Sequence, residues 1–282
     1  MGINLFKHEM CRAGLSTKAA IIPDGKLHRF YIEGDRKGSL NGWYVLYGDG
    51  LASGAFGSWK TGIKCIWCAK ADHVLSHTER IQFKQQMNEA RKARETEERA
   101  QRETAKDKAL YIWKISPPAS DTHPYLIRKH IKSYGLREYK GSLVVPMRDN
   151  LGQLHSLQFI DSEGHKRFLS GGQKKGCYFA IGNPIDTLCI CEGYATAASI
   201  HQATGLSVAT AFDAGNLEAV ALALRDKFPD IKLTLCADND ADSPVNTGLN
   251  KARKAAIAVG ALLAIPPIIG DFNDLFSGGK HA

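Results

Sequence analysis

Apolar runs and helix-like segments alternate along the last third of the chain. Continuous apolar runs predict strands that are covered on both faces, and the segments between them are rich in good helix formers. This alternation predicts parallel strands joined by crossover helices, and therefore an α/β fold with a parallel sheet flanked by helices over residues 186–282. The expected strands are residues 186–193, 206–212 and 231–237, and the expected helices are residues 194–204, 216–228 and 246–261.

Three regions with other patterns precede this one. Residues 1–75 are rich in glycine and aromatic residues, and a Gly-Asp-Gly between apolar runs at residues 48–50 indicates a hairpin, so we expect a small β-rich domain. Residues 76–110 lack Gly and Pro and carry charges of both signs, which predicts one long, largely solvated helix that connects two domains. Residues 111–185 return to globular composition with a strand–turn–strand pattern, which predicts a smaller, basic α+β domain.

Composition narrows the class of protein only slightly. The 282 residues carry a formal net charge of +8, which suits an anionic partner. Seven cysteines, an odd number, and an opening segment that does not read as a secretory signal predict a reducing, cytoplasmic setting. The apolar residues 255–269 are too short for a membrane span and contain two prolines, so we expect a helix end followed by a buried strand, and no membrane association.

Acidic side chains follow each expected strand of the C-terminal region. Glu192 follows the first strand, Asp213 the second, and three aspartates at residues 238, 240 and 242 the third. Open parallel sheets bind ligands beyond the carboxyl ends of their strands, so these acids should gather at one edge. An Asp-x-Asp by itself is more often a solvated turn, but carboxylates at successive strand ends would repel one another unless a hard divalent cation neutralised them. The pattern therefore predicts one or two Mg²⁺ or Mn²⁺ ions, which suit in-line chemistry at phosphorus.

Two of these segments resemble a known family. Residues 191–199, CEGYATAAS, and residues 237–242, ADNDAD, resemble the Toprim domain of bacterial primases, topoisomerases and related nucleases. GDFNDLF at residues 270–276 resembles the acidic closing element of the primase versions, and residues 34–62, 123–129, 143–160 and 165–179 are similar to primases of phages and conjugative plasmids. The resemblance implies a DNA primase that makes short RNA primers on single-stranded DNA from ribonucleoside triphosphates. The residues contain no P-loop, so any helicase would be a separate protein or a missing segment.

The resemblance also implies roles for individual residues. The implied catalytic and metal-binding residues are Glu192, Asp238 and Asp240, with Asp242 as a further metal ligand and Asp271 and Asp274 as outer acidic residues. The implied nucleotide- or nucleic-acid-binding residues are Arg148, Lys166, Arg167, Lys174 and Lys175. Lys174 and Lys175 could equally belong to an ordinary solvated loop.

Several alternatives stay open at this point. A Toprim-type nuclease would use water as its nucleophile, and a catalytically silent primase fragment would only bind single-stranded DNA. Asn216 could simply cap the helix that follows it. Cys65 and Cys68 precede two histidines at a spacing much shorter than that of zinc fingers, so zinc is not expected. The aromatic residues that could stack on bases, although a place in the core is favoured for them, are Trp43, Tyr44, Phe56 and Trp59.

Overall fold

A computed structural model describes residues 2–239 and 246–278 of the chain. It divides into two compact units, Met1–Ala100 and Gln101–Ala282, which are described separately. The division falls within the long helix α2 (His77–Ile115), so each unit contains part of this helix.

The N-terminal unit is built on a four-stranded antiparallel sheet of order β1-β2-β3-β4. Its elements are α1 (Gly2–Arg12), β1 (His28–Phe30), β2 (Gly42–Tyr47), β3 (Ser53–Ser58), β4 (Lys64–Cys68) and a 3₁₀ turn at Asp72–Val74. The Gly-Asp-Gly signal lies in the turn between β2 and β3, as the sequence predicts. We confirm a β-rich N-terminal region, to which two helices contribute.

Both faces of this sheet are covered, which explains the unbroken apolar run of β2. Tyr44 packs on one face with Phe6 of α1, while Trp43 packs on the other face with Ala90 of α2. Strand side chains alternate between faces, so a strand between two helices is apolar at every position. A buried hydrogen bond of 2.7 Å from Ser53 Oγ to a Gln86 side chain of α2 ties the sheet to the helix.

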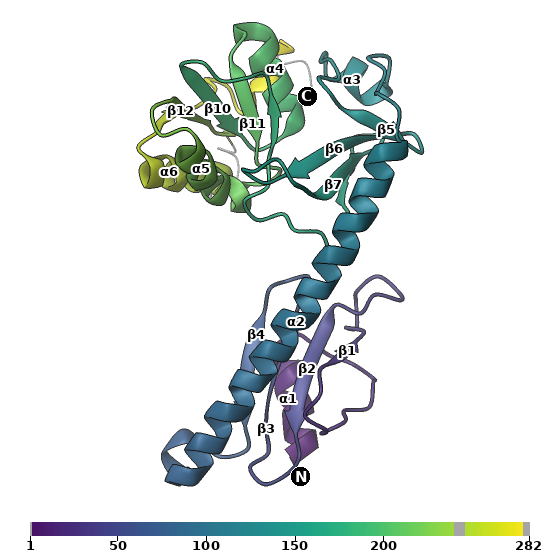
Figure 1. The fold of residues 1–282 in the computed structure, drawn as a ribbon, viewed down its shortest axis with the longest axis vertical. Helices are drawn as coiled ribbons and strands as arrows, with labels where there is room; N and C mark the ends of the chain where they lie inside the picture. Colours follow the sequence, from purple (N-terminus) through teal and green to yellow (C-terminus); the bar gives the residue numbers. More distant parts are fainter. Residues whose placement is uncertain (1, 240–245, 279–282) are drawn as a thin grey trace. The chain divides into compact units, whose positions relative to one another are not determined.

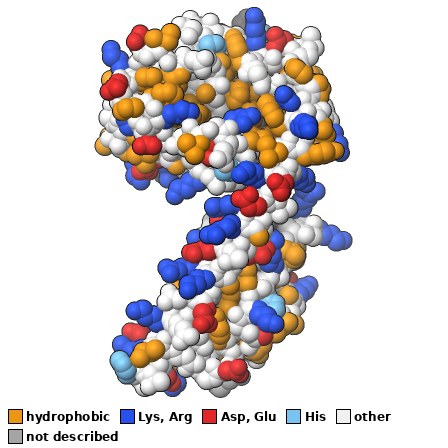
Figure 2. Space-filling model, in the orientation of Figure 1, with side chains coloured by type: hydrophobic (Ala, Val, Ile, Leu, Met, Phe, Trp, Pro, Cys, Tyr) orange, Lys and Arg blue, Asp and Glu red, His pale blue; other side chains and the backbone are white. Residues whose placement is uncertain are grey.

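Helix α2 begins with a capping box and runs further than the sequence predicts. The Ser76 Oγ accepts from the Glu79 N–H at 3.3 Å, and the Glu79 carboxylate accepts from the Ser76 N–H at 2.9 Å. The helix ends at Ile115 rather than near residue 110, because its last turns are amphipathic and pack on the second unit through Ala109 and Ile112. Lys and Arg alternate with Asp and Glu along its exposed surface (Figure 2).

The second unit contains another four-stranded antiparallel sheet, of order β5-β6-β7-β8. Its elements are α3 (Pro124–Arg128), β5 (Arg137–Tyr139), β6 (Ser142–Arg148), β7 (Leu154–Ile160) and β8 (Lys166–Phe168). Val144 and Phe159 face α2, while Leu143 and Ile160 join the core of the neighbouring parallel sheet. This sheet matches the α+β region that the sequence predicts.

A five-stranded sheet of order β13-β12-β10-β11-β9 completes the second unit (Figure 1). Strands β10 to β13 are parallel, and β9 pairs antiparallel to β11 at one edge. Helix α4 covers one face, where Cys189 and Cys191 point, and α5 and α6 cover the other, where Leu188 and Ile190 point. The elements are β9 (Phe179–Ile181), β10 (Thr187–Cys191), α4 (Tyr194–Thr204), β11 (Ser207–Thr210), a 3₁₀ turn at Ala214–Asn216, α5 (Leu217–Lys227), β12 (Lys232–Cys236), α6 (Thr247–Val259), β13 (Leu262–Ala264) and α7 (Phe272–Phe276).

The predicted alternation of strands and helices is confirmed, with one error at the apolar residues 255–269. Helix α6 does end within this segment and β13 follows it, but β13 is not buried, and its Leu262 is 66% exposed. The strand lies at the edge of the sheet, where only one neighbour shields it. Across the described residues, no helix is both long and apolar enough to span a membrane.

Candidate functional site

The central strands of the parallel sheet end level with one another. Cys191 is in register with Thr210 on one side and with Cys236 on the other. Glu192 therefore follows β10 at the same edge at which the chain leaves β12 toward Asp238. The Thr210 hydroxyl donates a hydrogen bond of 2.8 Å to the Glu192 carbonyl, which fixes the backbone of this residue.

A short antiparallel bridge brings a second acidic segment to this edge. The Asn239 N–H donates to the Gly270 carbonyl, and the Gly270 N–H donates to the Asn239 carbonyl, both at 2.9 Å. In an antiparallel pair, the residue before one member lies opposite the residue after the other, so Asp238 lies opposite Asp271. The Asn239 amide also donates to the Ile268 carbonyl at 2.9 Å, which holds the incoming segment in place.

The two aspartates of α7 differ in what binds them. Asp271 and Asp274 form a capping box at the start of this helix, each accepting from the backbone N–H of the other. One Asp271 oxygen also accepts from the Thr196 hydroxyl of α4 at 2.8 Å, while Asp274 lies 3.5 Å from the Lys129 ammonium. The structure therefore places Asp271 at the acidic edge beside α4, and pairs Asp274 with Lys129.

The Cys191 thiol reports the electrostatics of this edge. Burial raises its pKa well above the ordinary value, and the neighbouring groups Asp238, Cys189, Asp271 and Glu192 raise it further, in that order. Three carboxylates thus act on one buried thiol from three segments of the chain. Burial raises the pKa of the nearby Tyr125 to about 12, and Asp271 contributes to this shift as well.

The donor chemistry of this edge suits a hard divalent cation, although the described residues do not form a preassembled cage. Carboxylate oxygens are the ligands that Mg²⁺ and Mn²⁺ prefer. In the described ranges, no three His, Cys, Asp or Glu side chains are close enough together to hold one ion. The predicted ligands Asp240 and Asp242 lie outside the described residues.

Strand β8 brings one predicted basic residue to the same edge. A methyl group placed on Gly193, directly after Glu192, would lie 3.5 Å from the Lys166 ammonium and 3.6 Å from the Thr196 hydroxyl. Lys166 therefore lies over the start of α4, beside the acidic residues. Its neighbour Arg167 points to the opposite face of the strand, where its guanidinium lies 5.2 Å from the centre of the Phe159 ring.

Lys174 belongs to a network at the end of β11. Its ammonium pairs with Asp213 and lies 5.0 Å from the centre of the Phe168 ring, which in turn contacts Phe212 edge-on. Lys174 is thus no free solvated side chain, but the carboxylate beside it already neutralises its charge.

Asn216 organises this network instead of capping a helix with its side chain. Its amide nitrogen donates to three backbone carbonyls, at 2.9 to 3.1 Å, and its amide oxygen accepts from the Gly176 N–H at 2.8 Å. The three carbonyls belong to Lys174, Cys177 and Ala211. Asn216 stands at the N-cap position of α5, but its side chain makes no capping hydrogen bond, because its amide is engaged by these three carbonyls and by the Gly176 N–H.

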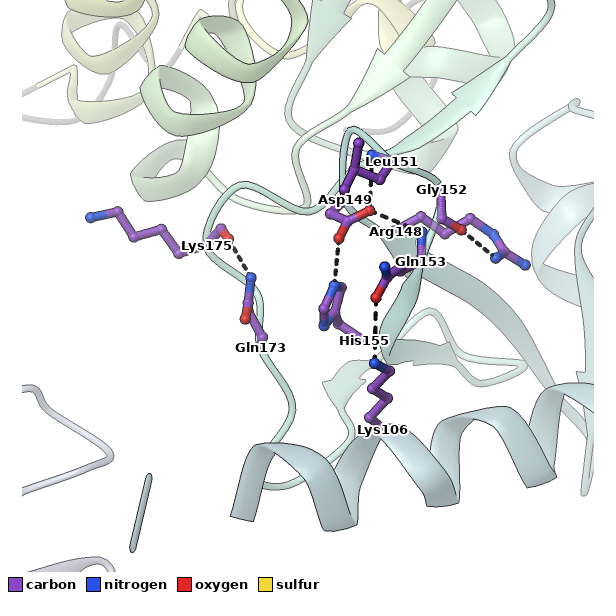
Figure 3. Close-up of polar contacts among 9 residues, drawn as sticks. All are labelled: Lys106, Arg148, Asp149, Leu151, Gly152, Gln153, His155, Gln173 and Lys175. Atoms are coloured by element: carbon purple, nitrogen blue, oxygen red, sulfur yellow. Dashed lines mark hydrogen bonds and ion pairs between the residues drawn. The ribbon is translucent and has the colours of Figure 1, made fainter. Parts of the chain in front are cut away.

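Arg148 and Lys175 diverge from each other (Figure 3). The Arg148 guanidinium folds back to donate a 2.9 Å hydrogen bond to the Gly152 carbonyl, and burial together with Arg137 lowers its pKa. Lys175 points away from this turn and is exposed. Of the five basic candidates, the structure thus brings Lys166 to the acidic edge and Lys174 to its margin.

The structure shows where the aromatic residues and the cysteine pair of the N-terminal unit lie. Trp43, Tyr44 and Phe56 are 2% to 3% exposed, so these three rings belong to the core, whereas Trp59 is half-buried. Cys65 and Cys68 are three positions apart on β4, so their side chains point to opposite faces of the sheet. This orientation does not suit one shared metal ion.

Sequence reasoning missed Thr196 and Asn239, which position the acidic residues through side-chain hydrogen bonds. Thr196 lies in the first turn of α4, and its signal is its place three residues after Gly193, the glycine that precedes this helix. Asn239 lies inside the aspartate-rich segment itself, where its amide was overlooked among the carboxylates.

Comparison with known proteins adds three findings. Residues 187–280 match the Toprim domain family. Two DNA primases TraC from Escherichia coli are 34% and 35% identical to this chain over 273 and 279 residues, each match covering 93% of the chain. The matches span 25% and 19% of those two proteins, so the chain is similar to a limited part of each.

A solved structure of the primase fragment of the bacteriophage T7 primase-helicase protein is also similar. It shares 18% sequence identity with a TM-score of 0.41, and the match covers 55% of this chain and 69% of that fragment.

Proposed function

Because residues 187–280 are a Toprim domain and the chain is similar to TraC primases along 93% of its length, we propose that it synthesises RNA primers. In this proposal it is a nucleotidyltransferase that joins ribonucleoside triphosphates on single-stranded DNA. The observation that carries the proposal is geometric: Glu192 and Asp238 follow neighbouring strands at one edge of the sheet, Asp271 lies opposite Asp238, and the Lys166 ammonium lies above the start of α4. Negative ligands for a cation lie next to a positive charge for phosphate, as phosphoryl transfer requires.

The reaction forms one bond and breaks one. The 3′-hydroxyl oxygen of one nucleotide bonds to the α-phosphorus of the next, and pyrophosphate leaves with the electrons of the broken phosphoanhydride bond. Glu192 is the candidate to hold the hydroxyl proton or to share in binding metal. A bound Mg²⁺ or Mn²⁺ would supply charge neutralisation at the reacting phosphate, with Glu192, Asp238 and Asp240 as its first ligands and Asp242 as a further one.

The remaining residues orient these groups. Thr196 fixes the Asp271 carboxylate opposite Asp238, so that Asp271 completes the outer part of the site. Lys166 neutralises a phosphate of the incoming nucleotide, and the absence of a side chain at Gly193 lets that phosphate approach the N–H groups at the start of α4. Lys174 would contact the template or nucleotide only by exchanging its Asp213 partner for phosphate.

The proposed partners are single-stranded DNA, ribonucleoside triphosphates and a separate replicative helicase. The 282 residues contain no G-x-x-x-x-G-K-[ST] phosphate-binding loop, so duplex unwinding would be supplied from outside this stretch of sequence.

A primer-synthesis assay tests this function. The full chain is incubated with single-stranded DNA, labelled ribonucleoside triphosphates and Mg²⁺ or Mn²⁺, beside the Asp238→Asn variant. Loss of one metal-binding carboxylate should lower synthesis by about 100-fold or more. The matched control is Asp230→Asn, which removes an exposed carboxylate just before β12, at the opposite edge of the same sheet.

The possible outcomes separate the three candidate functions. New short oligonucleotides from the wild type and the Asp230→Asn control, but not from Asp238→Asn, support the primase. A shortened template with no new strand would replace it with a Toprim-type nuclease. Salt-dependent binding of single-stranded DNA without either product would assign the chain to silent binders.

A further inference from the structure

Strand β4 forms a free edge of the N-terminal sheet. Among the described residues it pairs with β3 alone. The Ile63 carbonyl accepts from the Ser58 N–H and the Ala69 N–H donates to the Ala52 carbonyl, so Ile63 and Ala69 both turn their polar groups toward β3. Antiparallel pairing alternates, and therefore the N–H and C=O groups of Lys64, Ile66 and Cys68 point away from the sheet.

Hollows flank this edge strand on both faces of the sheet. One, of about 350 Å³, lies on the α1 side and is lined in part by Arg12, Phe56 and Trp67. The other, of about 330 Å³, lies on the α2 side and is lined in part by Trp43, Met87 and Arg91. Both hollows reach Ile66, which is 67% exposed. A strand added beside β4 would direct successive side chains alternately into one hollow and then the other.

The charges of the two hollows differ. Arg12 is neutralised by Glu9 at 2.9 Å, whereas Lys64, Arg91 and Arg94 line the α2-side hollow with no acidic residue among its lining. Glu95 lies 3.8 Å from Arg94, yet the Arg94 Nε is buried and donates no hydrogen bond within the described part of the chain. Three cations beside the Ile66 and Met87 side chains suit an occupant that presents carboxylates next to apolar groups.

We propose that the β4 edge binds an extended acidic peptide segment of a partner protein, which adds a fifth strand to the N-terminal sheet. The side chains of this peptide that enter the α2-side hollow would be acidic, and those that enter the α1-side hollow would be apolar. A second copy of this chain fits less well, because it would bring its own cations against Lys64 and Arg91. Bases of single-stranded nucleic acid also fit less well, because Trp43 is buried and offers no ring face.

The test begins with random heptapeptides displayed on phage and selected on the immobilised full chain. Phage that also bind the Arg91→Glu variant are discarded, because they bind elsewhere on the chain. Arg91 is not among the residues of the proposed primase site. We expect enriched peptides that alternate acidic and apolar residues. An absence of enriched peptides, or enrichment of basic ones, would overturn the proposal.

Fluorescence anisotropy with the enriched peptide then tests the binding mode. Arg91→Glu should weaken binding by about 10-fold or more, while the exposed Lys84→Glu of the same helix should change it by less than about 2-fold. N-methylation of the peptide amides that face β4 should abolish binding, and N-methylation of the alternate amides should not. Binding that tolerates both methylation patterns is inconsistent with strand addition and would overturn the proposal.

Two further readouts identify the competing occupants. A labelled oligodeoxythymidine that binds the wild type but not Arg91→Glu, with no peptide enriched, would assign the surface to nucleic acid. A concentration-dependent dimer in sedimentation that Arg91→Glu abolishes would assign it to a second copy. Either result would overturn the proposal.

Discussion

The two antiparallel meanders, β1–β4 and β5–β8, have the same strand order and pack against the same helix, α2. They differ in what covers the other face. In the first meander this is the short helix α1, and in the second it is the core shared with the five-stranded sheet. Their fourth strands therefore meet different surroundings, because β8 lies beside the acidic edge while β4 keeps a free edge between two hollows. Two sheets with the same strand order thus place their fourth strands in different surroundings, because different elements cover the face that points away from α2.

The largest expected effect is the loss of unfolding free energy when a buried ring between α2 and either meander is removed. Trp43→Ala and Phe159→Ala each remove a buried ring on the face toward α2, and each should cost about 3 to 5 kcal/mol of unfolding free energy. Urea unfolding followed by hydrogen exchange should show loss in residues 2–100 for the first variant and in residues 101–278 for the second. The exposed Leu151→Ala serves as control. If either variant lowered protection from exchange equally in both units, the prediction would be contradicted, because the two units would then unfold together.

The second prediction concerns Asn216, which anchors the loop that follows the second meander, between β8 and β9. Asn216→Ala removes the amide that donates to the buried carbonyls of Cys177 and Ala211 and to the Lys174 carbonyl, and it should destabilise the second unit by about 2 to 3 kcal/mol. Thermal unfolding beside Asn250→Ala, an exposed asparagine of α6, measures the difference. If the two variants were equally stable, the loop between β8 and β9 would not depend on this residue.

The third prediction tests which face of β8 serves the site. Lys166→Ala should weaken binding of a labelled ribonucleoside triphosphate by about 10-fold, or about 1.4 kcal/mol, because it removes the ammonium beside Gly193. Arg167→Ala should change the affinity by less than about 2-fold, since Arg167 stacks on Phe159. Titration by fluorescence anisotropy, with the exposed Lys251→Ala as a further control, distinguishes them. A larger loss in Arg167→Ala would reverse the assignment of the two faces.

The smallest effect is the pH dependence of the turn between β6 and β7. Burial opposes ionisation of Asp149, but hydrogen bonds from His155 and from backbone N–H groups outweigh it and lower the pKa of Asp149 below 3.8 (Figure 3). A carboxyl group whose pKa is lowered by folding stabilises the fold at every pH above its ordinary, unfolded-state pKa. This stabilisation is lost as the pH falls through the lower pKa of the folded state. Asp149→Asn should therefore cost about 1 kcal/mol at pH 7 and nothing at strongly acidic pH.

Unfolding of the wild type and Asp149→Asn between pH 7 and pH 2 measures this difference, with the exposed Asp226→Asn as control. A gap that stayed constant over this range would show that the Asp149 charge does not contribute.

The sequence by itself determined the three central strands of the five-stranded sheet, β10, β11 and β12, and the acids that follow them. Period and apolar run length decide which segments become strands, and the direction of each parallel strand decides where its final residues lie. The aromatic rings of β2 could likewise be assigned to the core from their apolar run, as burial of Trp43 and Tyr44 confirms.

Only the tertiary structure decided which of these groups face one another. Asp238 meets Asp271 through a bridge between segments separated by a helix and a strand, and no local pattern encodes that register. Lys166 and Arg167 are adjacent and chemically alike, so only the layer packed behind β8 selects one for the site. Asn216 stands at a cap position, but its side chain binds the Ala211 carbonyl and two carbonyls about 40 residues earlier in the chain. Periodicity specifies burial along one segment, whereas contact between segments depends on how their buried faces pack together.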